Sequence, residues 1–459
     1  MIRKLTALVG LVAVSVGSAP GIALAAPGSK LWASRYDATG TSYESAADIG
    51  VSPDGSTVFV TGRSVESVIE GDYITVAYDA VIGTELWVAR YDGPEHLDDR
   101  ATAISVSPDG SAVFVTGSSA GSTPYTDDYA TVAYDASTGT KLWVGRYDSP
   151  TRGDDDATAL AVSADGSAVF VTGGSFGSSR FDDYATVAYG ASDGLELWVK
   201  RYDSPEHQFD AAKDIGVSAD GSVVFVTGQS TGATNNDYGT VAYDATTGSR
   251  LWVKHYSGRR TDIARALAVS PDGSALFVTG GSVRHTRGGD FVTVAYEPST
   301  GAKLWSRRYD YTRSDYAIAV EVSPDGSVVF VTGPSVRPTS GRDYATVAYD
   351  AATGATLWTS RYEGNQGDAA TALGLSPDGS TVFVTGVSER STSDSDLATV
   401  AYDAVTGAEV WVKRYNGTGN GYDHVNALAV DPNGSAVFVA GVTVRSTGYD
   451  SVTLAYSVT

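Results

Sequence analysis

A carboxylate stands ten residues before the aspartate of each Ser-Pro-Asp-Gly turn or its equivalent. Carboxylate oxygens are the ligands that calcium prefers, so a ring of such residues could hold calcium or a cationic ligand. The alternative role is to accept backbone hydrogen bonds where a strand begins, and eightfold repetition favours this scaffold role. The carboxylates are Glu44, Asp99, Asp155, Asp210, Asp262, Asp315, Asp368 and Asp423.

A second group with chemical potential consists of arginines. Residues 250–345 carry 13 Lys and Arg against 9 Asp and Glu, whereas residues 92–193 carry 5 against 16. The guanidinium fork matches carboxylate, sulfate and phosphate groups, so the basic sector could bind an anionic glycan or an acidic partner. Ordinary solvated surface charge is the alternative. The candidate ligand-binding arginines are Arg259, Arg260, Arg284, Arg287, Arg313, Arg337 and Arg342.

Histidines supply the remaining candidate metal ligands. The pair Glu95-His96 recurs as Glu206-His207, and His285 and His424 lie in comparable positions between predicted strands. A third ligand at a recognisable spacing is missing, so we expect exposed loop residues and assign no metal site. The sequence also contains no nucleophile-base-acid set, no phosphate-binding glycine loop and no HExxH motif, and we assign no catalytic residue.

The elements that position these residues form an array of one repeated unit. Tryptophans recur 53 to 56 residues apart, and a Val/Leu-Phe-Val-Thr/Ala-Gly segment recurs with the same period. Such a period indicates a repeat architecture. The eight tryptophans are Trp32, Trp87, Trp143, Trp198, Trp252, Trp305, Trp358 and Trp411.

Each repeat contains four candidate strands, at residues 141–148, 157–163, 167–173 and 183–189 in one example. Four-stranded units repeated eight times predict an all-β fold, an eight-bladed β-propeller of four-stranded antiparallel blades. The strand rich in small residues should be innermost, and the tryptophan strand outermost. We expect the N-terminal strand, near residues 30–37, to complete the last blade and close the ring.

Antiparallel strands assign the connections to two faces. The Ser-Pro-Asp-Gly-Ser and Tyr-Asp-x-x-Thr-Gly turns are short and uniform and should share one face. The connections that precede the inner strands and follow Val-Phe-Val-Thr-Gly are longer and differ between repeats. We call the face that carries them the variable-loop face, and we predict that it holds the binding function, with the eight carboxylates at the rim of a central funnel.

The N-terminus and the composition suggest where the protein works. Basic residues, an apolar run and Ala-Leu-Ala predict a secretory signal peptide at residues 1–25, with an uncleaved anchor as the alternative. Residues 26–459 should form a single propeller domain that is secreted, extracellular or at the cell surface. The chain has no cysteine and a net charge of -22. We therefore expect no disulfide, no nucleic-acid partner and no membrane span, and we expect a monomer.

Two repeat motifs resemble known families. Ala-x-Asp-x-x-x-Gly-x-x-x-Trp, at residues 133–143, resembles the tryptophan-docking motif of quinoprotein (PQQ-repeat) dehydrogenases, which are eight-bladed propellers. Val-Ser-Pro-Asp-Gly-Ser-x-Val-Phe-Val-Thr-Gly is similar to the YVTN-type repeat of surface-protein propellers. The first resemblance implies pyrroloquinoline quinone (PQQ) held between a tryptophan floor and a disulfide between adjacent cysteines, with calcium nearby. The chain lacks cysteine and uses all eight tryptophans for docking, so we do not expect PQQ.

The sequence therefore predicts a secreted, non-enzymatic propeller that binds a protein or an anionic glycan through its variable-loop face. No cofactor is expected, although calcium fits the carboxylates. One alternative is an extracellular enzyme, a quinoprotein-type oxidoreductase or a carbohydrate-active enzyme, with a site in the central funnel. A purely structural module of the cell surface is the other.

Overall fold

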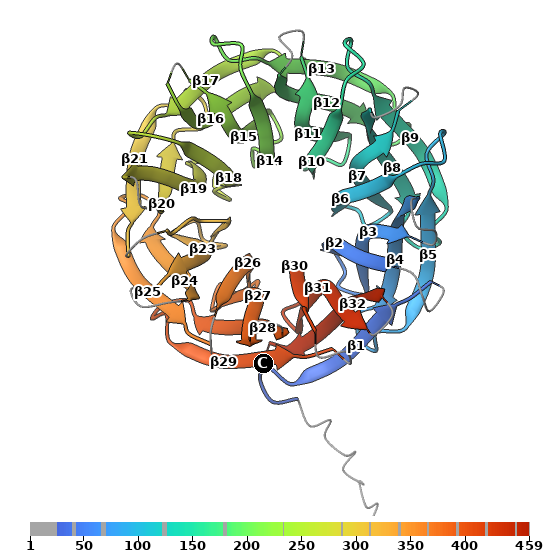
Figure 1. The fold of residues 1–459 in the computed structure, drawn as a ribbon, viewed down its shortest axis with the longest axis vertical. Coiled ribbons are helices and arrows are strands. Elements are labelled where there is room, and N and C mark those ends of the chain that lie inside the picture. Colours follow the sequence, from blue (N-terminus) through green and yellow to red (C-terminus); the bar gives the residue numbers. More distant parts are fainter. Residues whose placement is uncertain are drawn as a thin grey trace, which may run out of the picture.

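A computed structural model describes residues 25–458, apart from 39–42, 66–69, 122–125, 178–180, 233, 286–287, 312–313, 338–340, 365–366, 392–393, 418–420 and 446–447. The described residues form 32 β-strands arranged in eight radial blades around an open centre (Figure 1). The structure thus confirms the predicted fold class. Most of the predicted signal peptide lies outside the described residues.

The strands fall into four sets by their place in a blade. The innermost strands are β2 (Tyr43–Val51), β6 (Asp99–Val106), β10 (Asp155–Val162), β14 (Asp210–Val217), β18 (Asp262–Val269), β22 (Ala319–Val322), β26 (Asp368–Leu375) and β30 (His424–Val430). The second strands are β3 (Thr57–Val65), β7 (Ala112–Ala120), β11 (Ala168–Phe176), β15 (Val223–Thr231), β19 (Leu276–His285), β23 (Val328–Val336), β27 (Thr381–Ser391) and β31 (Ala436–Arg445). The third strands are β4 (Gly71–Asp79), β8 (Asp127–Asp135), β12 (Asp182–Gly190), β16 (Asn236–Asp244), β20 (Gly288–Tyr296), β24 (Arg342–Asp350), β28 (Asp394–Asp403) and β32 (Gly448–Ser457). The outermost strands are β5 (Glu85–Tyr91), β9 (Lys141–Tyr147), β13 (Glu196–Tyr202), β17 (Arg250–Tyr256), β21 (Lys303–Tyr309), β25 (Thr356–Tyr362), β29 (Glu409–Tyr415) and β1 (Lys30–Tyr36).

Each blade is an antiparallel ladder in chain order, as the blade β10-β11-β12-β13 illustrates. Leu160 pairs with Val171, Val171 pairs with Val187, and Val187 pairs with Val199. These β-branched and apolar residues are typical of strands covered on both faces, which explains the continuous apolar runs. The inner strands lie at the centre and the tryptophan strands at the circumference (Figure 1), as the sequence predicts.

The ring closes through the two ends of the described chain. Strand β1 pairs antiparallel with β32, with Ala33 opposite Leu454, and so becomes the outer strand of the blade β30-β31-β32. A single parallel bridge between Tyr43 and Tyr449 connects this blade to the first one. The predicted closure by the N-terminal strand is confirmed, and it removes the exposed edge that an open array would present.

The tryptophans lie between neighbouring blades. Trp143 is buried beside Phe114 of its own blade and Tyr189 of the next, and its indole Nε1 donates to the carbonyl oxygen of Ala191 at 2.8 Å. Each blade interface therefore buries one large apolar wedge. Its single polar atom is satisfied at every interface but that of Trp411, whose Nε1 is buried without a hydrogen-bond partner among the described residues. Six more tryptophans make the equivalent hydrogen bond: Trp32, Trp87, Trp198, Trp252, Trp305 and Trp358.

Candidate functional site

The eight repeated carboxylates are fully buried at the starts of the inner strands. Asp210 shows their role, because its carboxylate accepts hydrogen bonds from the backbone N–H groups of Ser204 at 2.7 Å and Thr231 at 2.9 Å. Burial raises the pKa of the equivalent Asp155 to about 6, and its hydrogen bonds to Ser175 and Ser149 oppose the rise. Their burial does not fit an open funnel rim. Backbone hydrogen bonds to Asp99, Asp155, Asp210 and Asp423 match the alternative role, that of accepting such bonds where a strand begins. The set comprises Glu44, Asp99, Asp155, Asp210, Asp262, Asp315, Asp368 and Asp423.

Some of the candidate arginines have exposed side chains, and one forms ion pairs within the protein. Arg259, Arg260, Arg284 and Arg342 are exposed. Arg337 is not free for a ligand, because its guanidinium forms ion pairs with Asp343, Glu363 and Asp368. The prediction that Arg337 binds a ligand is therefore wrong: its side chain forms internal ion pairs. Arg287 and Arg313 lie outside the described residues.

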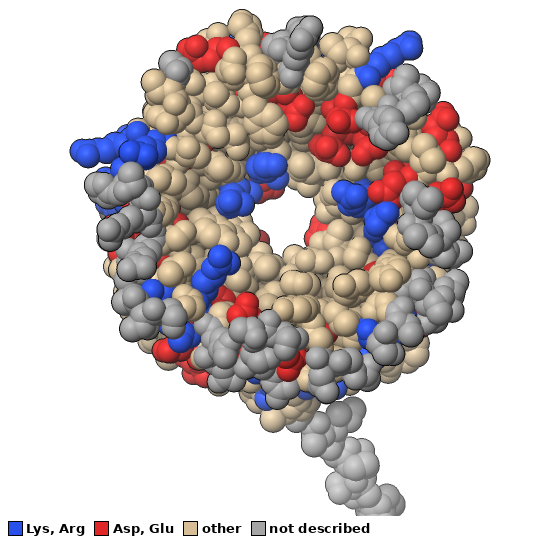
Figure 2. Space-filling model, in the orientation of Figure 1, with Lys and Arg blue, Asp and Glu red and all other residues tan. Residues whose placement is uncertain are grey.

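The face is electrically uneven. Figure 2 shows basic side chains gathered at the edge near β19 and β21 and acidic ones over the blade of β10–β13. Within the acidic group, burial raises the pKa of Asp127 to about 6, and repulsion from Asp156, Asp154 and Asp98 adds to the rise. Such a dipole across one face can orient a charged partner before contact.

The two repeated histidines form matching turns. His96 and His207 are exposed and have positive φ angles of 53° and 50°. Each ring Nδ1 lies 2.6 Å from a carboxylate oxygen, that of Asp92 or Asp203. Hydrogen bonding to these carboxylates raises both histidine pKa values. The His285 side chain is outside the described set.

A hollow of about 640 Å³ opens where the last blade meets the first. Tyr43 and Tyr449 line it with ring centroids 5.6 Å apart, and they are 52% and 43% exposed. His424, Asn426 and other polar residues form the rest of the wall. Sequence reasoning missed this hollow, since it searched for charged residues and repeated positions. The signal was an aromatic residue directly before three of the eight carboxylates, at Tyr43, Phe209 and Tyr422.

Further charged residues on inner strands also escaped the sequence analysis. Asp48, Asp214 and Glu321 replace the small residues that other repeats carry at these positions. Desolvation on the inner strands raises their pKa values to about 6, about 7 and about 7, although the Glu321 side chain is exposed and the two aspartates are half-buried. Electrostatic repulsion couples Glu321 to Asp214 and Asp214 to Asp48. Because these strands belong to non-adjacent blades, the repulsion acts across the channel. Figure 2 shows that the channel is open, with basic side chains at its mouth near β14.

The residues present do not fit a PQQ site of the dehydrogenase type. The sequence contains no cysteine for the adjacent disulfide. All eight tryptophans are buried at blade interfaces, and none provides a floor on the channel.

Comparisons with known proteins agree with the architecture. A family model described as outer membrane protein assembly factor BamB matches residues 132–337. BamB from Moraxella catarrhalis is 17% identical, with 94% of this chain and 99% of that chain covered and a TM-score of 0.54. Sqt1 from Chaetomium thermophilum is 13% identical, with coverages of 94% and 99% and a TM-score of 0.62.

A third similar structure is the quinohemoprotein alcohol dehydrogenase from Comamonas testosteroni, at 13% identity, 94% and 76% coverage and a TM-score of 0.56. No curated protein sequence matches the chain. At these identities the likeness extends to the fold, and together with the family model it confirms the resemblance to PQQ-repeat propellers. Among the described residues no helix has the length and apolarity needed to span a membrane.

Proposed function

Since the chain is an eight-bladed propeller whose repeats resemble PQQ repeats, we propose that it is a non-enzymatic scaffold that binds an extended segment of a partner protein. The binding surface is the variable-loop face, centred on the hollow beside Tyr43 and Tyr449. We further propose that residues 1–25 direct the protein out of the cytoplasm and that it works in the extracellular space or at the cell surface.

The observation that carries the proposal is the pair of exposed tyrosines over the hollow. Their rings are 5.6 Å apart, and together they present apolar area with hydroxyl groups at its margin. Tyrosine is enriched at protein interfaces because it buries a large ring at small entropic cost and still makes a polar contact. Asn426 is fixed beneath them by a hydrogen bond from its Nδ2 to the carbonyl oxygen of Ala46 at 2.5 Å.

Other aromatic side chains of the same face remain exposed. Phe209 precedes β14, Phe181 precedes β12, and Tyr311 follows β21, each at the variable-loop ends of its blade. A solvated structural face would carry mainly polar side chains at such positions. These side chains lie on other blades than the hollow and could only extend the contact with a partner that reaches across the face.

One structural relative points to the same kind of partner. Sqt1 from Chaetomium thermophilum is described in a complex with the N-terminus of the ribosomal protein L10, and that structure matches this chain with a TM-score of 0.60 at 14% identity. A propeller of similar shape thus accommodates a terminal protein segment. This supports a peptide-like ligand for the present chain.

An anionic glycan is the alternative ligand. Arg259 and Arg260 lie on the connection between β17 and β18, and Arg284 lies near the end of β19, all exposed. They could bind sulfate or carboxylate groups without help from Arg337. The quinoprotein-type oxidoreductase has fold similarity in its favour, but the residues required for the quinone are missing.

The proposal can be tested by selection from a random peptide library on the immobilised protein. A second selection uses the variant Tyr43→Ser/Tyr449→Ser, and a third uses Leu142→Ser/Leu197→Ser, which removes two exposed apolar residues from outer strands. We expect peptides that are enriched on the wild type and the outer-strand variant but not on the tyrosine variant. Equal enrichment on all three proteins would refute binding at the hollow.

A further inference from the structure

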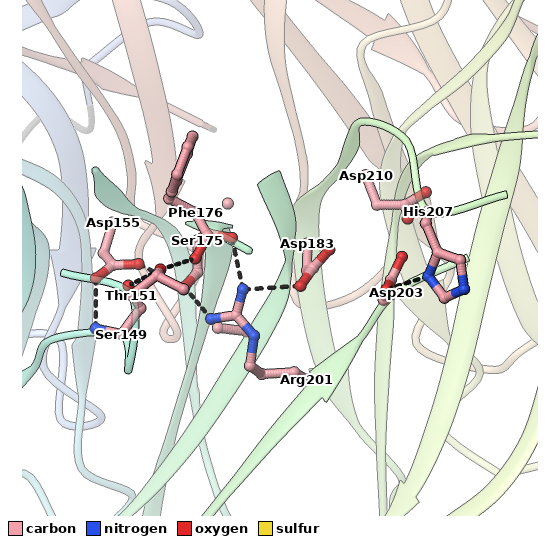
Figure 3. A network of polar contacts seen from close by, with 12 residues as sticks. Ser149, Thr151, Asp155, Ser175, Phe176, Asp183, Arg201, Asp203, His207 and Asp210 are labelled. Carbon is pink, nitrogen blue, oxygen red and sulfur yellow. Dashed lines mark hydrogen bonds and ion pairs between the residues drawn. The ribbon is translucent and has the colours of Figure 1, made fainter. Parts of the chain in front are cut away.

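Three carboxylates converge where the blade β10–β13 meets the blade β14–β17. Asp183 lies at the start of β12, Asp203 directly follows β13, and Asp210 begins β14. Each contributes one oxygen, and these oxygens all lie within 4.8 Å of one another. Two oxygens that bind one ion at about 2.4 Å can be at most about 4.8 Å apart, so the spacing suits a shared cation. Figure 3 shows the three side chains turned toward a common region.

The hydrogen bonding of the cluster is incomplete. Asp183 is 5% exposed, and one of its oxygens accepts a hydrogen bond from Arg201 Nη2 at 2.9 Å. Its other oxygen is buried without a hydrogen-bond donor among the described residues. The same holds for one oxygen of Asp203, whose second oxygen contacts His207. Buried carboxylate oxygens are costly without a donor or a cation, and two residues of this cluster each have one such oxygen.

An equivalent cluster three interfaces further along carries its own cation. There the guanidinium of Arg337 bridges Asp343 and Glu363, with Nη1 2.9 Å from the Glu363 carboxylate. Asp343 also pairs with Arg361, just as Asp183 pairs with Arg201. The oxygen of Asp343 that contacts Arg337 therefore corresponds to the unpaired oxygen of Asp183.

The residue at the position of Arg337 explains the difference. Arg337 directly follows β23, and Gly177 directly follows β11 at the equivalent place. A Cβ at residue 177 would lie 2.6 Å from Asp183, so the glycine leaves the carboxylates accessible from that side. At the closure of the ring, Arg445 again occupies the cluster, with Nη1 2.6 Å from Asp37. The chain places a second arginine in some clusters, whereas here only one oxygen of Asp183 has an arginine partner, Arg201, and its other oxygen has no donor among the described residues.

We propose that Asp183, Asp203 and Asp210 form a divalent cation site, and that calcium is the ion it takes. All three ligands are hard oxygen donors, and calcium accepts the irregular arrangement that three separate strand ends provide. Bound there, the ion fastens the connection after β13 to the two neighbouring blades. It thereby shapes the acidic part of the variable-loop face. This role is independent of the proposed protein partner.

Carboxylates occupy the same three positions at other blade interfaces, so calcium uptake is measured as a difference between variants. The related groups are Asp72, Asp92 and Asp99; Asp128, Asp148 and Asp155; and Asp290, Asp310 and Asp315. The wild type can therefore bind more than one calcium ion. A variant that lacks only the site at Asp183 must then bind one ion fewer than the wild type.

The test is isothermal calorimetry of the chelator-treated full chain with calcium chloride. We expect the wild type to bind calcium and Asp183→Asn/Asp203→Asn to bind one equivalent less. The control Asp193→Asn/Glu196→Gln, with the same charge change on the turn before β13 and on that strand, should retain the wild-type number. No calcium uptake by the wild type at millimolar concentration, or unchanged uptake by the double variant, overturns the proposal.

A second measurement protects against misfolding of the double variant. Asp203→Asn alone changes a partly exposed side chain and preserves an acceptor for His207. Calcium should raise the melting temperature of the wild type and raise that of Asp203→Asn by clearly less. Equal shifts in the two proteins contradict the site.

Discussion

Gly194 lies against the indole ring of Trp143 across a blade interface, and a Cβ at residue 194 would come within 2.6 Å of that ring. The backbone of Gly194 has a φ of 69°, in the region that L-residues avoid. Conformation and close packing therefore demand glycine at the same position. The repeat spacing of glycine and tryptophan reflects a contact between successive blades.

Replacing Gly194 with alanine separates these two demands. Gly221 has a similar φ of 74° but nothing within 4 Å of its added Cβ, so Gly221→Ala serves as the control. We expect Gly221→Ala to cost about 1 kcal/mol of unfolding free energy through backbone strain. Gly194→Ala should cost about 1 to 3 kcal/mol more, because the methyl group displaces the indole. Chemical denaturation measures both; equal losses would contradict the packing contribution.

The indole itself should matter more than either glycine. Trp143→Ala removes a buried wedge and should lower the unfolding free energy by about 3 to 5 kcal/mol. The loss also deprives the carbonyl of Ala191 of its donor. Trp143→Phe should keep part of the packing and lose less. A cost below 1 kcal/mol for the alanine variant would show that blades dock without the wedge.

Arg337 gives a test of the internal ion pairs. Arg337→Ala leaves one oxygen of Asp343 buried without its cation and leaves Arg414 as the cation near Asp368, and we expect a loss of about 3 kcal/mol. Calcium should recover part of that loss, because the vacated cluster then resembles the one at Asp183. Melting temperatures with and without calcium provide the readout. An Arg337→Ala protein as stable as the wild type would remove the basis for comparing the two clusters.

Stability should fall as the pH rises through neutrality. Desolvation on the inner strands raises the pKa values of Asp214 and Glu321 in the folded protein to about 7, above the usual range of acidic side chains. The folded state then holds protons that the unfolded state releases, so unfolding becomes easier between about pH 4.5 and pH 8. Glu321→Gln should flatten this decline, with a higher melting temperature than the wild type at pH 8 and a similar one at pH 5. Glu196→Gln, on the outer strand β13, should leave the profile unchanged; a profile for Glu321→Gln that parallels the wild type would exclude the channel carboxylate.

The fold could be predicted from the sequence because the same four-strand pattern occurs eight times. The spacing from Ala133 to Trp143 predicts a strand, a turn and a second strand. The number of times this pattern recurs gives the number of blades. Closure by residues 30–37 followed from counting strands at the two ends. The order of strands within a blade followed from the small residues of segments such as 157–163.

The site was less predictable, because it depends on which side chains meet between repeats. Eightfold repetition favoured a scaffold role for Asp210, and Ser204 and Thr231 do donate backbone hydrogen bonds to it, but the identity of these donors is visible only in three dimensions. Arg337 looked like a surface arginine, although its guanidinium lies among three carboxylates of the same and the next blade. Tyr43 and Tyr449 are 406 positions apart in the sequence and meet only because the ring closes.

The most direct test of the proposed binding face is a fluorescence anisotropy titration with one labelled peptide from the library selection. We predict saturable binding to the wild type and at least a tenfold weaker affinity for Tyr43→Ser/Tyr449→Ser, since each anchor at the hollow contributes about 1 kcal/mol or more. Leu142→Ser/Leu197→Ser should bind like the wild type. If the tyrosine variant binds with wild-type affinity, the hollow on the variable-loop face is not the binding site.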